Sequence, residues 1–595
     1  MDQIDKRLLK SNEWVWNNGL LIPKWTLAKP TKNNFDKEVI AYGTFRDLFP
    51  DDQNSEELIK SSYSSFWVYD IMEVLCKLNY IVSFTQLKES TKEDLALAYT
   101  FLEDTAVYNF LNHKETRKII TRQQLLANIR LALLYASETQ TGKTVLGNEK
   151  EFGKLIYRVT DFLESYTRFK DEKNPTDTER KKLYLTMARN LFFNESSTFV
   201  LALCRYWYIY NVVAYRKQNR KAKIKHQFKQ ATKIEYNNLL AVGFAIWGFY
   251  CESSKSQRLS KPEEFLFNEN YFRNTDKKVR RGLTNALSMI AGDFSYYRNE
   301  FSKIKTTEEH YFLNPFWKKP LFKNSHGAYS IIDSKFLEER ITEGAYWMVF
   351  DELIEGNASK KELSDFGSQW GCIFEDYVNE LVASAYSKKP KRVLFEKNGD
   401  KTGGVDVIII YPETLVLIEV TTKKVRYDEW IRGDYSAVKD SFYRIFIKDE
   451  RSKGRVVKLY EAVQKIKSAK LQIDGCDMKN IKRILPIVVF EKSPPMYNRL
   501  WHIYNTFLKE NGIKDQVFLD DLDFWNIEEL EMVLADVQHG KTIPEIINEK
   551  DKVGFFKNSV RNFYIMYRKH FDRHSVLEDV FKKMTAGFTR ILFNK

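Results

Sequence analysis

The sequence predicts a multidomain protein with a mainly α-helical N-terminal half, a mixed α/β domain and a helical C-terminal end. Three observations lead to this prediction. The chain has 595 residues, which is too long for one compact core, because a domain takes roughly 100–200 residues. Apolar residues recur at helical spacing through residues 61–310. Beyond residue 365, a long helical pattern is followed by two short runs of β-branched residues.

These patterns divide the chain into five segments, none of which shows a fixed repeat period. They are an irregular, polar segment (1–60), an α-helical recognition or interaction domain (61–310), a lead-in module with short aromatic strands (311–364), the α/β domain (365–525) and a helical C-terminal segment (526–595). In the fourth segment the order is helix, strand, strand, helix, strand, which is typical of an α/β domain. Residues 484–491 and 516–525 are its later predicted strands.

Composition limits the possible partners and compartments. The net charge of +14 favours an anionic partner such as nucleic acid, although a sequence rich in Lys, Asn, Ile and Phe can also carry surplus surface lysine. The five scattered cysteines form no zinc or iron–sulfur pattern, and their odd number favours a reducing compartment. No signal sequence is recognisable, and no apolar run approaches the ~18–20 residues that span a bilayer. We therefore expect a cytoplasmic protein without a membrane partner.

The stretch GGVDVIIIYPETLVLIEVTTKK, residues 403–424, contains the main candidate site. If VDVIII and LVLIEV pair around the turn Tyr-Pro-Glu-Thr, Asp406 lies opposite Glu419 on the same face. Opposed residues have Cβ atoms roughly 4.5–5.5 Å apart, and like charges at that separation are destabilising. A divalent cation such as Mg²⁺ removes the repulsion. A slip of one residue would instead place the two acids on opposite faces.

A third acid precedes the hairpin. In Gly371-Cys-Ile-Phe-Glu375 the glutamate lies at the edge of the apolar face of a predicted helix. An acid there can point along a cleft, which makes Glu375 a candidate third carboxylate. On its own it would be an ordinary surface acid.

With these residues, segment 365–525 resembles the PD-(D/E)xK nuclease superfamily. The resemblance rests on the G-x-x-F-E helix, on Asp406 and Glu419 on paired strands, and on a following helix with Gln464 and Lys467. It implies a restriction-endonuclease-like core in which Asp406, Glu419 and Glu375 bind Mg²⁺ or Mn²⁺. The implied activity is hydrolysis of phosphodiester bonds, with DNA as the expected substrate.

A large helical module joined to such a nuclease is also similar to bacterial antiphage and restriction effectors. That similarity implies a role in defence against foreign nucleic acid. It further implies a partner protein bound through the helical half.

The sequence departs from the superfamily at Thr421, where the pattern has a lysine that orients the attacking water. If the strand continues, Lys423 shares the face of Glu419 one pleat repeat further along, and Lys424 points away. Lys467 on the next helix is the other candidate replacement. The alternative is a catalytically inactive nucleic-acid-binding or sensor protein that retains the nuclease fold.

A basic segment in the helical half is a candidate nucleic-acid surface. Residues 215–233 contain eight Lys or Arg and no acid, and such a run can follow a phosphate backbone. The candidate contacts are Arg216, Lys217, Arg220, Lys221, Lys223, Lys225 and Lys229. No base-reading motif is recognisable.

Two further patterns are not expected to be functional. The run from Thr139 to Thr144 is similar to a phosphate-binding loop, but a helical pattern precedes it where a strand is required. His570 and His574 are four residues apart, yet basic residues surround them and no acid lies between them. We expect a loop lysine at Lys143 and an exposed basic helix around the histidines.

Overall fold

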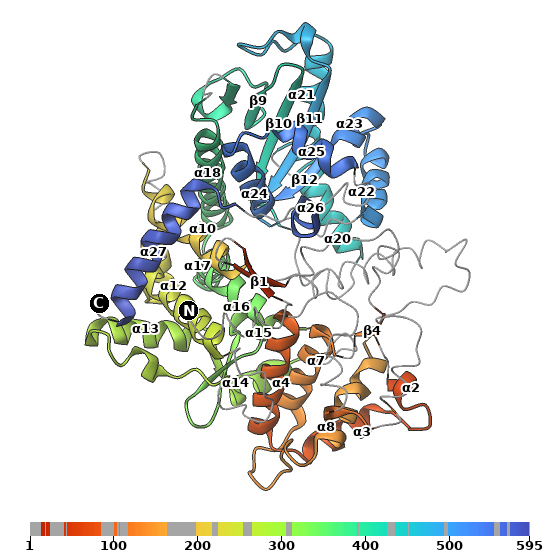
Figure 1. The fold of residues 1–595 in the computed structure, drawn as a ribbon, viewed down its shortest axis with the longest axis vertical. Helices are drawn as coiled ribbons and strands as arrows, with labels where there is room; N and C mark the ends of the chain where they lie inside the picture. Colours follow the sequence, from red (N-terminus) through yellow and green to blue (C-terminus); the bar gives the residue numbers. More distant parts are fainter. Residues whose placement is uncertain are drawn as a thin grey trace.

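The computed structural model describes residues 14–17, 20–23, 41–42, 45–84, 100–103, 106, 117–118, 120–163, 198–216, 224–253, 265–304, 312–388, 392–424, 435–449, 452–492, 498–552, 560–567 and 572–593. Figure 1 shows the described chain as an elongated molecule, with the α/β part at one end and the first helices at the other. The prediction of a mainly α-helical chain with a mixed α/β part is confirmed at this level. In the described residues no helix is long and apolar enough to cross a membrane.

The N-terminal segment predicted to be irregular contains regular structure. Its first described elements pair as an antiparallel hairpin, in which Val15 lies opposite Ile22. Capping explains one of its helices, because the Ser55 side chain accepts a hydrogen bond from the Leu58 backbone N–H. The elements are β1 (Trp14–Asn17), β2 (Leu20–Pro23), β3 (Ala41–Tyr42), α2 (Phe45–Leu48) and α3 (Glu56–Ser64).

Segment 61–310 is helical as predicted from its apolar periodicity. Most of residues 95–111 lie outside the described residues. The described elements are α4 (Val68–Phe84), β4 (Arg117–Lys118), α7 (Arg122–Tyr135), α8 (Glu149–Arg158), α10 (Phe199–Asn211), α11 (Ile224–Thr232), α12 (Tyr236–Ser253), α13 (Lys277–Met289), β5 (Ala291–Asp293) and α14 (Phe294–Ser302).

The lead-in module combines short strands and helices, as predicted. Its strands β6 (Leu321–Lys323) and β7 (Tyr329–Ile331) form a three-stranded sheet with β5, in the order β5-β6-β7. Its helices are α15 (Asn314–Lys318), α16 (Ser334–Ile341) and α17 (Gly344–Glu355). Arg122 on α7 donates to both carboxylate oxygens of Asp333, which also caps α16, and so the buried pair joins this module to the first helices.

The α/β segment is built on one five-stranded mixed sheet, in the order β12-β11-β10-β9-β8. Strands β8, β9 and β10 are antiparallel neighbours, whereas β10, β11 and β12 run parallel. The elements are α18 (Lys360–Ala385), β8 (Val393–Phe395), β9 (Val407–Ile410), β10 (Thr414–Thr421), α20 (Tyr435–Phe442), the π-helix η11 (Tyr443–Ile447), α21 (Arg455–Lys467), β11 (Arg483–Phe490), α22 (Asn498–Glu510), α23 (Gln516–Asp521) and β12 (Asp523–Asn526).

Helices cover both faces of this sheet. Ile409 and Ile418 point to the face covered by α18, and Ile408 and Leu417 point to the face covered by α20, α21 and α22. Each strand is therefore apolar on both sides, which explains why VIII and LVLI carry no alternation. The predicted strand at 516–525 is wrong in its first half, because residues Gln516–Asp521 form a helix that Asp515 caps.

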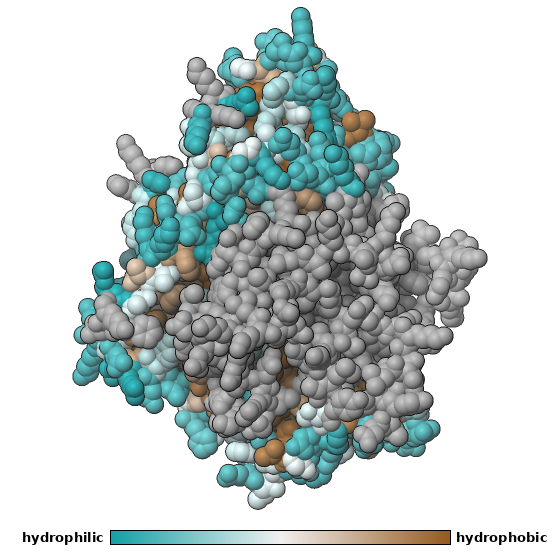
Figure 2. All heavy atoms as spheres, viewed as in Figure 1, coloured by the Kyte–Doolittle hydropathy of each residue, from teal (hydrophilic) through white to brown (hydrophobic). Residues whose placement is uncertain are grey.

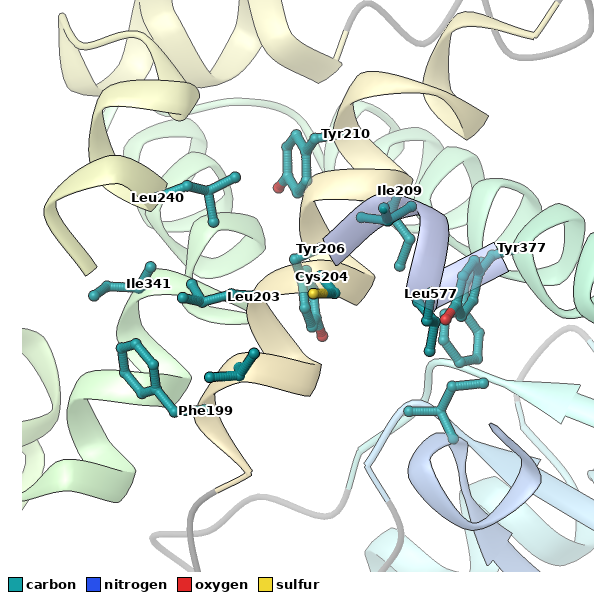
Figure 3. Close-up of a cluster of buried hydrophobic side chains, with 14 of the residues drawn as sticks. Phe199, Leu203, Cys204, Tyr206, Ile209, Tyr210, Leu240, Ile341, Tyr377 and Leu577 are labelled. Atoms are coloured by element: carbon teal, nitrogen blue, oxygen red, sulfur yellow. The ribbon is translucent and has the colours of Figure 1, made fainter. Parts of the chain in front are cut away.

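The C-terminal helices are α24 (Ile527–Gln538), α25 (Ile543–Lys552), α26 (Val560–Tyr567) and α27 (Ser575–Phe593). Of these, α27 returns to the helical half and packs against α10 and α12, whereas α24, α25 and α26 lie with the α/β segment. Figure 3 shows Cys204 and Ile209 of α10 in one cluster with Tyr377 of α18 and Leu577 of α27. The apolar core on the α18 face of the sheet therefore continues into helices α10 and α12.

Candidate active site

The hairpin of β9 and β10 has the predicted register. Leu415 lies opposite Ile410, and Leu417 lies opposite Ile408. Continuing this register by two residues places Asp406 opposite Glu419, on the face that is covered by α21. Both acids are buried, with Glu419 0 % exposed and Asp406 5 % exposed. The sheet thus holds two carboxylates together in its interior.

The two acids differ in their partners. Asp406 Oδ2 accepts a hydrogen bond of 2.7 Å from the Val420 backbone N–H. Glu419 Oε2 lies 2.9 Å from the Arg455 guanidinium and 3.5 Å from the Lys458 ammonium. Its other oxygen, Oε1, is buried and accepts no hydrogen bond from the described residues. One oxygen of this carboxylate therefore lacks the partner that a buried charge requires.

The electrostatics of Glu419 reflect this burial. Burial, which removes solvent, is the largest cause that raises the pKa of Glu419 to about 8, and the negative charge of Asp406 is the second. The positive charges of Arg455 and Lys458 lower this pKa but do not cancel the rise. Without a further cation, the site therefore favours a protonated Glu419 near neutral pH.

Glu375 lies near this pair, within α18 and at the edge of that helix's buried face. It is partly buried, and burial followed by the charge of Asp406 raises its pKa to about 7. The adjacent Asp376 is buried and pairs with Lys397. In the described part of the chain, no group of three or more His, Cys, Asp or Glu side chains is arranged to hold a metal ion. The acidic centre is thus the pair Asp406 and Glu419, with Glu375 close enough to interact through its charge.

The residues present fit a hard divalent cation. Mg²⁺ binds proteins through one or two carboxylates and keeps several waters, and the opposed pair supplies two carboxylates. The Glu419 Oε1 atom without a donor is the observation that supports this fit.

The structure does not bring the predicted cations to the acids. Strand β10 ends at Thr421, so the same-face argument for Lys423 does not apply, and its ammonium lies 2.7 Å from Asp449. Lys424 is largely buried, with 11 % of its side chain exposed, and its ammonium lies 3.3 Å from both Glu343 and Glu491.

The predictions for Lys467 and Gln464 are also corrected. Both side chains bond to Asp515, at 3.0 and 3.1 Å. Lys467 ends α21, nine residues beyond Lys458, which is ~13 Å along the helix axis. These two residues therefore face the opposite end of the sheet from the carboxylates.

Arg455 and Lys458, which the sequence analysis missed, provide the positive charge at the site. They lie three residues apart in the first turn of α21, and residues at this spacing share a helix face. In the sequence they belong to the run RVVK, which opens the helix directly after Gly454 and does not by itself indicate which end of the helix lies at the acids.

The described part of the basic segment at 215–233 is engaged within the protein. Arg216 lies 2.8 Å from Glu380 and Lys229 lies 2.5 Å from Glu235. Lys225 is half-buried, donates to Asn211, and its pKa is lowered by burial. Lys217, Arg220, Lys221 and Lys223 lie outside the described residues. The acids missing from this segment are thus supplied by its neighbours, and the predicted nucleic-acid contacts stay a prediction.

In their described residues, the run from Thr139 to Thr144 and the histidine pattern form no site. Lys143 lies in a loop and pairs with Glu151 at 2.8 Å, as an ordinary loop lysine does. His574 is buried, which corrects the expected exposed helix, and its Nε2 lies 3.1 Å from the Leu381 carbonyl. Burial lowers the pKa of His574 to about 4. His570 lies outside the described residues.

Comparison with known proteins gave no match. No protein-family model matches the chain, and neither curated proteins nor solved structures contain a significant relative.

Proposed function

We propose that this protein is a metal-dependent phosphodiester hydrolase that acts on nucleic acid, with DNA as the expected substrate and defence against foreign nucleic acid as its role. The observation that carries the proposal is the opposed, buried pair of Asp406 and Glu419, in which Glu419 Oε1 has no donor. A fold gains nothing from two buried carboxylates in direct opposition. A bound dication gives both a partner.

Each residue has a distinct part in this proposal. Asp406 and Glu419 would hold Mg²⁺ or Mn²⁺. Glu375, on α18, would orient a water or a metal ligand. When bound, the metal supplies an activated water and stabilises negative charge on the phosphoryl oxygens. The Val420 N–H donates to one Asp406 oxygen, Oδ2, so the other oxygen would be the one that binds the metal.

Lys458 would provide the ammonium that Thr421 does not. Its ammonium lies 3.5 Å from Glu419 Oε2, so it already reaches the carboxylate that would hold the metal. Thr421 is 2 % exposed, which leaves no solvent path for a charged side chain at that position. A cation that enters from the first turn of α21 keeps 29 % of its side chain exposed and avoids this cost.

A second candidate function is a catalytically inactive nucleic-acid-binding or sensor protein. The observation in its favour is Arg455, which lies 2.9 Å from Glu419 and 4.0 Å from Asp406. The guanidinium can neutralise the acids without a metal. In that case the carboxylates and α21 form a permanent ion-pair cluster within the sheet.

Cleavage assays separate the two functions. Purified protein is incubated with plasmid, single-stranded DNA or RNA, each with Mg²⁺, Mn²⁺ or a chelator. The hydrolase requires metal-dependent cleavage that Asp406→Asn abolishes and Glu413→Gln retains, because Glu413 is an exposed acid in the same hairpin, paired with Lys482. Cleavage that survives Asp406→Asn would exclude the assigned site. Binding of nucleic acid without cleavage by any metal would support the second function.

A further inference from the structure

One nitrogen of the Arg455 guanidinium lies close to both carboxylates of the site. Its Nη1 atom is 2.9 Å from Glu419 Oε2 and 4.0 Å from Asp406 Oδ2. Glu375, the third acid, also acts on this guanidinium through its charge. In the described part of the chain, Arg455 is therefore the cation nearest to the acidic pair.

Two other arginines show what a structural ion pair looks like in this protein. Arg122 donates through Nε and Nη2 to both oxygens of Asp333. Arg205 forms the same two-pronged contact with Glu531. Only 3 % and 8 % of these two arginine side chains are exposed. Paired hydrogen bonds of this kind are the strong form of an arginine–carboxylate contact.

The contact between Arg455 and Glu419 is of a different kind. Only Nη1 donates, and only Oε2 accepts. The other oxygen, Oε1, is buried and has no donor among the described residues. The Arg455 side chain is 27 % exposed, so the guanidinium has access to solvent. This ion pair can therefore break without leaving the arginine buried and unpaired.

Cations differ in whether they can replace this guanidinium. Na⁺ and K⁺ carry the same single charge and bring no N–H donor, so their exchange for Arg455 gains nothing. Mg²⁺ carries twice the charge, which doubles its Coulomb attraction to a carboxylate at a given distance. It also binds carboxylate oxygens directly, and Glu419 Oε1 is an oxygen that Arg455 does not use. The exchange is thus favourable for a dication only.

We propose that Arg455 is an internal counter-ion that a divalent metal displaces, and that it determines which cations enter the site. This inference rests on the proposed metal-dependent function. In the metal-free protein the guanidinium neutralises Glu419 and closes the site to monovalent cations. When a dication binds, Arg455 leaves the carboxylate and turns towards solvent. The apparent metal affinity is then reduced to the fraction of molecules in which the guanidinium has left.

Chemical modification of arginine measures this displacement in the full chain. Phenylglyoxal reacts with accessible guanidinium groups, and peptide mass spectrometry reports the rate at each arginine. We expect Mg²⁺ to raise the rate at Arg455 ~10-fold, because it breaks one charge-assisted hydrogen bond. Replacing tetramethylammonium by K⁺ at the same ionic strength should not change the rate. Arg444, an exposed arginine in η11 that bonds to Ser441, is the control and should react equally in all solutions.

The contrary result is an Arg455 that stays protected although calorimetry shows bound Mg²⁺. An increase in K⁺ as large as that in Mg²⁺ would refute the selectivity for dications.

Metal affinities of variants provide a second readout. Calorimetry is carried out at about pH 9, above the pKa of Glu419 of about 8, so that protons compete little with the metal. Arg455→Met removes the competitor and should bind Mg²⁺ ~10-fold more tightly than the wild type. Arg455→Lys keeps a cation and should bind like the wild type, as should Arg444→Met. A purely structural arginine predicts the opposite, so weaker binding by Arg455→Met would overturn the proposal.

These outcomes separate the inference from the proposed function. If Mg²⁺ exposes Arg455 but no nucleic acid is cleaved, the exchange of counter-ions stands and the hydrolase proposal fails. If the protein cleaves nucleic acid with Mg²⁺ while Arg455 stays protected, only the exchange is refuted. If neither the wild type nor Arg455→Met binds Mg²⁺, both proposals fail.

Discussion

Replacing Glu419 by glutamine should stabilise the metal-free protein at alkaline pH. The unfolded chain ionises this residue near its ordinary pKa of 4.5, whereas the folded chain holds the proton to about 8. Between these two values the folded state binds more protons than the unfolded state, so stability falls as pH rises and is constant above about 8. Glutamine resembles the protonated acid and does not carry this penalty.

The size of the effect follows from the same values. A difference between 4.5 and about 8 corresponds to about 5 kcal/mol at full ionisation. The glutamine amide is a poorer partner than the carboxyl for Arg455 and Lys458, which offsets ~2 kcal/mol of this gain. A net gain of ~3 kcal/mol raises the midpoint of thermal unfolding by ~9 °C in a unit of about 200 residues.

Thermal unfolding in a chelator measures this gain at about pH 4.5 and about pH 8.5. The variant should exceed the wild type at the higher pH and match or fall below it at the lower pH. Glu413→Gln, at an exposed position, is the matched control. Saturating Mg²⁺ should stabilise the wild type and not Glu419→Gln. A variant less stable than the wild type at both pH values would refute the reasoning.

Three further predictions concern the metal, the cation and the shared core. The affinity for Mg²⁺, measured by calorimetry, should rise up to ~10-fold per pH unit until about pH 8 and then level off, because protons compete for Glu419; a flat profile would contradict this. Lys458→Met should lower the rate of cleavage at saturating Mg²⁺ ~100-fold, whereas Lys467→Met should cleave normally. Arg205→Met should cost ~3–5 kcal/mol in denaturant unfolding, because it leaves the buried Glu531 without its charged partner; a cost below ~1 kcal/mol would show that the pair between α10 and α24 does not stabilise the fold.

Much of the sheet could be predicted because its strands differ sharply from their surroundings. The runs VIII and LVLIEV are too β-branched and too short for helices, and the turn between them fixes the register. That register alone placed Asp406 against Glu419. Strand β8 was not predicted, since it has three residues and lies at the sheet edge. Residues 516–521 were misassigned because the apolar residues of a six-residue stretch fit a helix as well as a strand. The Asp515 side chain caps this stretch and stabilises it as a helix.

The cations could not be predicted because they depend on where β10 ends. A strand extended to Lys423 would have placed its ammonium near Glu419, but β10 stops at Thr421. Helix α21 then contributes its first turn to the site and not its last. Sequence gives the helix but not its direction relative to the acids, because that direction follows from the parallel pairing of β10 with β11.

The location of bound manganese in crystals of the full-length protein tests the central claim most directly. Anomalous scattering from crystals grown in Mn²⁺ should place one ion between the carboxylates of Asp406 and Glu419, with Arg455 displaced from Glu419. The contrary result is a site without manganese at saturating concentration, in which the guanidinium still lies against Glu419.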